Sequence, residues 1–339
     1  LLTKETLYSW TAYVHLWNGI PGAHQFSQQL YGDPHVALQH EFPSHLSRLD
    51  DAVEHELGDI LEIGIQHTLL GYFLPSVSSA LFTSILDEAT AGPRRSPKRR
   101  LGITRHQLGS HHPLKGCTDC FEEAKLTHGR AFWRVDHQYP STLACCEHER
   151  LLNTLLHPSP TNLRTAWLLP NPLDCKQWSP TDTKGLSSLK NLRALAHLSA
   201  EWAASEPGAF TPAALASTYF EVWREESGQR SEMPGRQLGF VASLAQHKYG
   251  DIGCFQRAFC FQSETCPTWN GFFHDLITPD RNGCIHPMKH LLAISLLFNS
   301  WRGFVDRYRS QCPTPNARPL LNRTSADRHP KTDPVGSND

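Results

Sequence analysis

Apolar residues recur at helical spacing along most of the first 93 residues of the chain. Over residues 6–18, one face of a predicted helix carries Leu7, Trp10, Tyr13, Val14 and Trp17. Gly19 is a suitable stop for this helix, and Ser44 is a suitable cap for another that runs through Glu56. The same spacing predicts helices over residues 23–31, 59–70 and 77–89. The pattern therefore predicts a helical N-terminal domain over residues 1–93.

A second helical region follows a proline-rich, irregular stretch at 158–183, where we place a domain boundary. It is predicted to contain helices over residues 186–204, 212–226, 234–249 and 286–308. Thr211 followed by proline, and Gly250, mark helix ends. The pair 234–249 and 253–261 fits either a DNA-reading helix–turn–helix or part of a structural bundle. We expect a helical domain over 184–312 and a disordered tail over 313–339, which is polar and proline-rich.

Two pairs of potential metal ligands lie between these helical regions. Cys117 and Cys120 form a C-x-x-C pair, and after 24 intervening residues Cys145 and His148 form a C-x-x-H pair. Three sulfurs and one imidazole are a ligand set that tetrahedral Zn²⁺ takes in a closed structural site. Cys146 could replace Cys145, but only Cys145 has the three-residue spacing to His148. No βαβ pattern surrounds the C-x-x-C pair, which disfavours a redox motif.

The residues between the ligand pairs are rich in glycine, histidine and aromatic side chains, which predicts short strands and turns. We therefore expect a mainly α-helical protein with a small zinc-ribbon module inside residues 94–170. Phe132 and Trp133 either pack over the metal site or stack on a nucleic-acid base, and packing is favoured because so small a module needs apolar area. His137 is expected to donate a hydrogen bond to a metal ligand.

The segment GRAFWRVDHQYP, followed by C-x-x-H, resembles the zinc-ribbon core of the TniQ/TnsD family. The segments LYSWTAYVHLWNG, HTLLGYFLP and HPMKHLLAISLLF also resemble parts of that family. Gly116, Cys146 and Glu149 depart from the family pattern, but none of these changes removes a ligand. The resemblance implies a target-selecting subunit of a bacterial cut-and-paste transposon. Such proteins bind DNA, recruit an AAA+ ATPase regulator, and in some members dock on an RNA-guided CRISPR effector complex.

Charge is distributed unevenly, although the net charge of the chain is −1. Residues 1–93 carry two basic and eleven acidic side chains, whereas residues 94–134 carry ten basic and three acidic ones. A basic stripe binds phosphate by releasing counterions, while an acidic surface repels it. We therefore expect the N-terminal helices to face a protein partner. The residues expected to contact DNA are Arg94, Arg95, Lys98, Arg99, Arg100, Arg105 and Arg134. The alternative is that this arginine-rich segment is merely solvated.

The sequence contains no phosphate-binding P-loop, no G-x-S-x-G and no H-E-x-x-H motif. A metal held by four protein ligands has no open position for a water, so we expect no catalysis. Two other functions stay open: a zinc-ribbon transcription regulator that binds DNA alone, and a nuclease built from Asp119, Glu122 and Asp136. A second zinc site is disfavoured by the wide spacing of Cys254, Cys260, Cys266, Cys284 and His286.

No segment has the roughly 20 consecutive apolar residues that a membrane span requires. Ten cysteines with one compact ligand motif are typical of a reducing compartment rather than of a disulfide framework. We therefore expect a cytoplasmic protein that does not interact with membranes.

Overall fold

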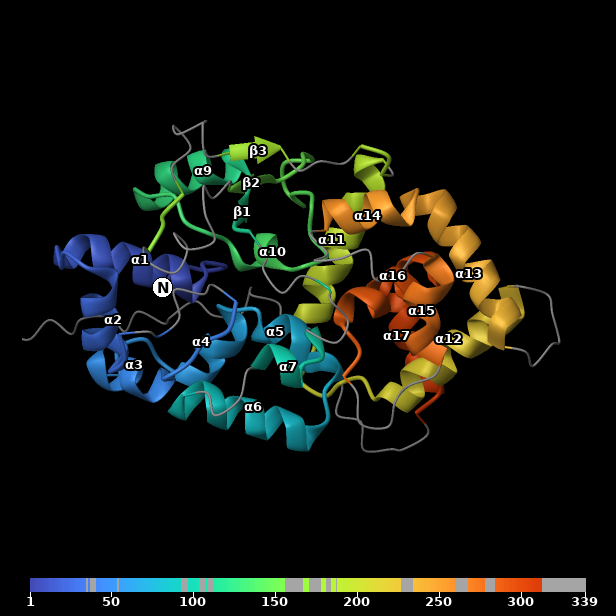
Figure 1. The fold of residues 1–339 in the computed structure, drawn as a ribbon, viewed down its shortest axis with the longest axis horizontal. Coiled ribbons are helices and arrows are strands. Elements are labelled where there is room, and N and C mark those ends of the chain that lie inside the picture. Colours follow the sequence, from blue (N-terminus) through green and yellow to red (C-terminus); the bar gives the residue numbers. More distant parts are fainter. Residues whose placement is uncertain are drawn as a thin grey trace, which may run out of the picture.

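A computed structural model gives the fold, which is mainly α-helical as the sequence predicts (Figure 1). The structure describes residues 1–34, 36, 41–53, 55–92, 97–103, 108, 113–155, 167–170, 178–180, 184–186, 188–226, 234–259, 268–277 and 284–312. The sequence-predicted contacts Arg94, Arg95 and Arg105, and the predicted tail over 313–339, lie outside these residues. Across the described ranges, no helix combines the length and the apolar character needed to span a bilayer.

The first two helices begin and end where local sequence signals place them. In α1 (Leu7–Asn18), the Thr6 hydroxyl accepts the backbone N–H of Ser9 at 3.0 Å, and Gly19 ends the helix with φ +63°. The second helix, α2 (Ala23–Tyr31), ends at Gly32, where φ is +73°. Glycine adopts this left-handed conformation without the steric cost that a side chain imposes.

The next predicted helices are shorter than the periodicity indicates. Helix α3 (Leu46–Ala52) is capped by His45 in a left-handed conformation, so the prediction of Ser44 as the cap is wrong. Asp59 caps α4 (Ile60–Gln66), which stops before the short elements α5 (Leu70–Phe73) and η1 (Leu74–Ser76). The break occurs because the backbone turns to tertiary partners: the N–H of Leu69 donates to the carbonyl of Glu41 at 3.0 Å. Helices α6 (Ser79–Ala91) and α7 (Pro97–Arg100) complete this part.

The central module contains a small antiparallel sheet in the order β1 (Lys115–Gly116), β2 (Asn153–Leu155) and β3 (Trp178–Pro180). Two helices lie between β1 and β2, namely α9 (Thr118–His128) and α10 (Val135–Gln138). The prediction of only strands and turns between the ligand pairs is therefore wrong. Residues 122–126 (EEAKL), in the middle of α9, are good helix formers, and Gly129 ends the helix with φ +73°. Strand β3 comes from the proline-rich stretch that was predicted to be irregular.

The remaining described helices form the C-terminal part: α11 (Leu189–Ala203), α12 (Pro212–Glu226), α13 (Pro234–Tyr249), α14 (Ile252–Ala258), α15 (Trp269–Ile277), α16 (Pro287–Leu297) and α17 (Trp301–Ser310). The single long helix predicted over 286–308 is in fact two helices. Phe298 is extended, and the Ser300 hydroxyl caps α17 by accepting the N–H of Gly303 at 3.1 Å. The extended Phe298 places its ring 5.4 Å from that of Phe304, so packing stabilises the break.

Helix α11 joins the N-terminal helices, the central module and the C-terminal helices (Figure 1). A chain of buried hydroxyls runs from Tyr72 to Ser141 at 2.9 Å and on to Ser199 of α11 at 2.6 Å. The indole N–H of Trp202, also on α11, donates to the carbonyl of Tyr72 at 3.0 Å. A buried donor or acceptor of this kind is costly to leave without a hydrogen-bond partner. The parts of the chain are therefore held together by polar contacts as well as by a shared apolar core.

Candidate metal centre

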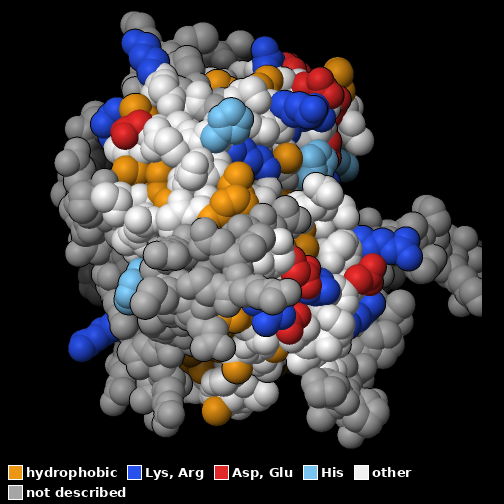
Figure 2. All heavy atoms as spheres, turned by 90° about the vertical axis from the view of Figure 1, so that its right-hand side faces the viewer, with side chains coloured by type: hydrophobic (Ala, Val, Ile, Leu, Met, Phe, Trp, Pro, Cys, Tyr) orange, Lys and Arg blue, Asp and Glu red, His pale blue; other side chains and the backbone are white. Residues whose placement is uncertain are grey.

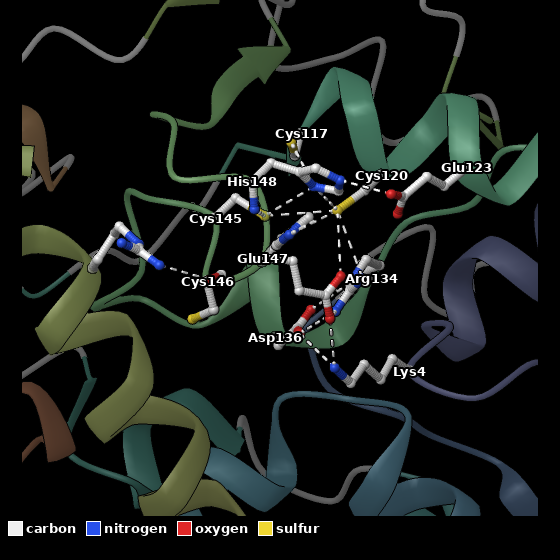
Figure 3. Close-up of polar contacts among 12 residues, drawn as sticks. Lys4, Cys117, Cys120, Glu123, Arg134, Asp136, Cys145, Cys146, Glu147 and His148 are labelled. Carbon is white, nitrogen blue, oxygen red and sulfur yellow. Dashed lines mark hydrogen bonds and ion pairs between the residues drawn. The ribbon is translucent and has the colours of Figure 1, made fainter.

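The four predicted ligands come together from two short structures. Cys117 is the N-cap of α9 and Cys120 lies in its first turn, so a single helix start supplies two sulfurs. Cys145 and His148 lie in a tight loop, closed by the N–H of Cys145 donating to the carbonyl of Arg150 at 2.8 Å. The side chains point toward one another across the gap between helix and loop (Figure 3).

Distances between the donor atoms match a tetrahedral metal site. The Nδ1 atom of His148 lies 3.7 Å from Cys117 Sγ, 3.3 Å from Cys120 Sγ and 3.7 Å from Cys145 Sγ. The sulfurs of Cys120 and Cys145 are 3.7 Å apart. Around Zn²⁺ with Zn–S of about 2.3 Å and Zn–N of about 2.0 Å, neighbouring ligand atoms are separated by about 3.5–3.8 Å. The four groups therefore surround a space that fits one Zn²⁺.

His148 is oriented for metal binding by the carboxylate of Glu123. The Nε2 atom of His148 lies 2.9 Å from Glu123 Oε1, which leaves Nδ1 to face the sulfurs. The hydrogen bond to Glu123 raises the pKa of His148. A carboxylate on the outer nitrogen fixes the tautomer and makes the inner nitrogen a better ligand, as is common in zinc sites. Glu123 lies one helical turn after Cys120, so the same helix supplies a ligand and the group that orients another.

The crowding of three thiols also fits a bound cation. Contacts with Cys117 and Cys145, together with burial, raise the pKa of Cys120, while the neighbouring thiols lower the pKa of Cys145. The thiols of the three cysteines therefore differ in how readily they lose a proton, because three buried thiolates this close together repel one another. A divalent cation removes that conflict, since it binds all three as thiolates. Because all four positions would be taken by protein ligands, the metal would have a structural role.

Cys146 does not join the group, although it is adjacent to a ligand. The cluster of potential ligands consists of Cys117, Cys120, Cys145 and His148. Burial raises the pKa of Cys146 to about 11, so its thiol stays protonated at neutral pH. The choice of Cys145 over Cys146 on spacing therefore agrees with the geometry.

The aromatic residues between the ligand pairs pack inward. Trp133 is fully buried, its ring meets that of Phe121 edge-on at 5.6 Å, and its Nε1 donates to the carbonyl of Leu168 at 2.7 Å. A ring without exposed surface cannot stack on a base, so the packing interpretation holds for Trp133. Phe132 is also buried. His137 is buried with Nε2 3.9 Å from Cys120 Sγ, close to the ligand as expected but at the long end for a hydrogen bond to sulfur.

Arg134 binds carboxylates beside the metal site, whereas the sequence predicts that it contacts DNA. Its guanidinium donates to Asp136 at 3.1 and 2.8 Å, and to Glu147 at 2.5 and 2.8 Å. Nη1 also lies 3.6 Å from Cys120 Sγ, and the side chain is only 12% exposed. These contacts use the donors that a phosphate would need. We therefore assign Arg134 to the support of the ligand loop instead of to DNA.

The part of the basic stripe (residues 94–134) that the structure describes is also largely engaged within the protein. Lys98 pairs with Glu41, and Arg100 pairs with Glu88 at 2.7 Å, so both bind acidic residues of the N-terminal part. Of the predicted DNA contacts in the described ranges, Arg99 alone is exposed without a recorded partner. On the face shown in Figure 2, the coloured Lys and Arg side chains are scattered, several of them beside Asp and Glu side chains, and form no continuous patch.

The acidic residues considered for a nuclease do not converge. Asp119 pairs with Arg150, Glu122 lies 3.6 Å from Lys125, and Asp136 pairs with Arg134. None of them belongs to a potential metal-binding group within the described ranges. The same holds for Cys254, Cys284 and His286, while Cys260 and Cys266 lie outside those ranges.

Sequence reasoning missed three residues around the site, namely Lys4, Glu123 and Glu147. Lys4 Nζ lies 3.0 Å from Glu147 Oε1, although 143 positions separate these residues in the sequence. No sequence signal marks that pairing. A signal did exist for Glu147, since it stands between two ligands, and for Glu123, which follows Cys120 at a spacing that places both on one helix face.

Comparison with known proteins connects this site to a family. Residues 1–152 match the TniQ family model, and this range contains all four candidate ligands. The chain is also similar to the transposon Tn7 transposition protein TnsD of Escherichia coli, with 24% identity over 152 residues. That match covers 44% of this chain and spans 30% of the length of the relative. Residues 1–152, which carry the four candidate ligands, are thus the part of the chain that matches the TniQ family.

Proposed function

We propose that the protein is a non-catalytic adaptor that selects target sites in bacterial DNA transposition and holds a structural Zn²⁺ at Cys117, Cys120, Cys145 and His148. The observation that carries this proposal is that the matched TniQ range contains the whole ligand cluster. The similarity to TnsD, a transposition protein, supports the same role. An enclosed metal with four protein ligands would stabilise the module rather than activate water. A role on chromosomal DNA would place the protein in the cytoplasm.

Within this role, we propose that the chain marks an insertion site and recruits an AAA+ ATPase regulator. The charge pairing supports an adaptor more than a regulator that binds DNA alone. Lys98, Arg100, Arg130 and Arg134 are engaged with carboxylates, so few of the described cations within residues 94–134 remain for phosphate. DNA affinity would then depend on Arg99, on the arginines 94, 95 and 105, and on partner proteins. The site would be chosen either by an attachment sequence or by an RNA-guided CRISPR effector.

Insertion mapping tests the proposal. The protein would be combined with a transposase and an AAA+ regulator from a transposon that encodes a TniQ protein, and insertions into a plasmid would be sequenced. We expect insertions to concentrate at one position with the wild type and with Cys146→Ser, and to lose that preference with Cys120→Ser. Cys146→Ser is a matched control, because it removes a neighbouring thiol that is not in the cluster. An insertion pattern that is the same without the protein would refute the adaptor role.

Two further assays separate the alternatives. Tight binding to one DNA sequence in a gel shift without partners would favour a stand-alone regulator. Cleavage of single- or double-stranded DNA by the metal-loaded protein, lost on chelation, would favour a nuclease. We expect weak, salt-sensitive binding in the first assay and intact DNA in the second.

A further inference from the structure

The N-terminal segment is attached to the metal module through the backbone. Glu5 and Arg134 form an antiparallel bridge, in which the N–H of Thr6 donates to the carbonyl of Trp133 at 2.8 Å. The N–H of Val135 in turn donates to the carbonyl of Lys4, also at 2.8 Å. Helix α1 begins directly after this bridge, at Leu7. The position of α1 therefore depends on the segment that precedes α10.

Side chains reinforce the attachment on both sides of the bridge. The fully buried carboxylate of Glu5 accepts two hydrogen bonds from Arg130, at 2.5 and 2.7 Å. On the other side, Lys4 Nζ lies 3.0 Å from Glu147 and 3.7 Å from Asp136. Both carboxylates also bind Arg134, so Lys4 and Arg134 share the same two acidic partners (Figure 3).

Arg134 connects this network to the ligands themselves. It belongs to the bridge with Glu5, and its guanidinium reaches Glu147, which stands between the ligands Cys145 and His148. It also lies 3.6 Å from the sulfur of Cys120, the ligand on the opposite side of the site. The side chain of Arg134 thus touches the helix that carries two ligands and the loop that carries the other two, while its backbone pairs with the N-terminal segment.

The energetic consequence follows from the burial of Arg134, which is 12% exposed. Removing Glu147 would leave this largely buried guanidinium with Asp136 as its remaining carboxylate partner, which destabilises the charged group. If the ligand loop moved away when the metal left, Glu147 would move with it, and both Arg134 and Lys4 would lose a partner. The N-terminal segment would then lose a contact that holds it in place.

We propose that Arg134 is a positioning residue that couples metal binding at the Cys117, Cys120, Cys145 and His148 site to the docking of residues 1–9. The coupling makes the position of α1 dependent on the metal. Because coupling between two events is reciprocal, weakening the attachment of the segment lowers the affinity for the metal. This inference rests on the proposed zinc at the site but not on the role in transposition.

Hydrogen exchange of the full-length chain, with zinc bound and after chelation, tests the coupling. The amide of Thr6 donates to Trp133, and that of Leu7 donates to the carbonyl of His67 at 2.7 Å. We expect both to exchange at least about tenfold faster after zinc removal, because their protection depends on docking. Amides of α17, which lies among the C-terminal helices, serve as the internal reference.

Variants provide the second part of the test. Arg134→Gln should weaken zinc binding about ten- to hundredfold, the usual effect of losing a group that supports ligands, and Arg134→Lys should recover part of it. Arg134→Gln should also raise the exchange rates of the Thr6 and Leu7 amides under saturating zinc. In the Co²⁺ form, the same variant should shift the sulfur-to-metal charge-transfer band. Arg150→Gln is the matched control: Arg150 also pairs with a carboxylate near the ligands, Asp119, but is exposed and outside the network. It should change none of these measurements.

The reciprocal variant is Lys4→Gln, at a side chain that is 51% exposed and whose loss should not unfold the protein. We expect it to weaken zinc binding about two- to fivefold, as for loss of an exposed ion pair. The coupling is refuted if chelation leaves exchange at Thr6 and Leu7 unchanged. It is also refuted if Arg134→Gln binds zinc as tightly as Arg150→Gln. Should Arg134→Gln fail to fold, wild-type affinity in Lys4→Gln refutes the coupling. A wild type that binds no zinc refutes the metal proposal itself.

Discussion

Replacing Trp202 with phenylalanine should show whether the TniQ-matched range unfolds together with the helices that follow it. Trp202 lies on α11, beyond residue 152, and is fully buried. Its ring stacks on Phe210 at 4.9 Å and on His290 at 5.5 Å, and its Nε1 donates to the carbonyl of Tyr72 in the matched range. The side chain therefore contacts both parts of the protein at once.

The cost of Trp202→Phe has two components. The Tyr72 carbonyl loses its indole donor in a buried position, which costs about 1–3 kcal/mol. Phenylalanine also buries about 40 Å² less apolar surface than tryptophan, which at about 25 cal/mol per Å² adds about 1 kcal/mol. The free energy of unfolding should fall by about 2–4 kcal/mol. Trp17→Phe is the matched control, because Trp17 is 73% exposed and the change should stay within about 0.5 kcal/mol.

Urea unfolding with two signals distinguishes the possibilities. Far-ultraviolet circular dichroism follows all the helices, whereas zinc release to a chromophoric chelator follows only the Cys/His site. If the parts unfold together, Trp202→Phe lowers both midpoints by the same urea concentration. If zinc release keeps its wild-type midpoint while the helical signal shifts, the C-terminal helices unfold independently. That result would refute our view that α11 joins the parts into one cooperative unit.

Three further predictions follow from individual side chains. Cys120→Ser should abolish stoichiometric zinc binding, whereas Cys146→Ser should retain one zinc per chain by elemental analysis, because only Cys120 is in the cluster. Arg99→Gln should reduce the salt dependence of DNA binding by about one phosphate contact, while Arg100→Gln should instead lower stability, since Arg100 pairs with Glu88. Burial lowers the pKa of His67 below its ordinary value of 6.5, so its contribution to stability is complete above that pH and declines as pH falls below it. Thermal unfolding between pH 8 and 5.5 should therefore show a smaller loss for His67→Gln than for the wild type, and an equal loss would contradict this assignment.

The parts of the structure that could be predicted from sequence are those set by local chemistry. The ligand pairs were identifiable because a knuckle of two close cysteines and a C-x-x-H turn act within four residues. The ends of α1 and α2 were identifiable because Gly19 and Gly32 adopt φ values that favour glycine. Each of these signals operates without reference to the rest of the chain.

The parts that could not be predicted depend on distant partners. Helix α4 stops where the backbone at Leu69 binds Glu41, and residues 286–308 divide where Phe298 packs on Phe304. Strand β3 forms only because β2 offers an edge to pair with. The hydrophobic periodicity continues through such positions because it depends only on which side chains are apolar. It does not indicate where the backbone forms hydrogen bonds.

Charge segregation in a sequence can reflect partners within the chain as readily as partners outside it. From sequence, we predict that the acidic N-terminal part binds a protein partner and that the basic segment after it binds DNA. In the structure, Glu5, Glu41 and Glu88 pair with Arg130, Lys98 and Arg100, so three of the eleven acidic side chains of residues 1–93 are neutralised by the basic segment. Arg130 joins the N-terminal segment to the metal module, whereas Lys98 and Arg100 hold α7 against the N-terminal part. Among the described residues, these three cations therefore stabilise the fold, and their charges are not free to bind phosphate.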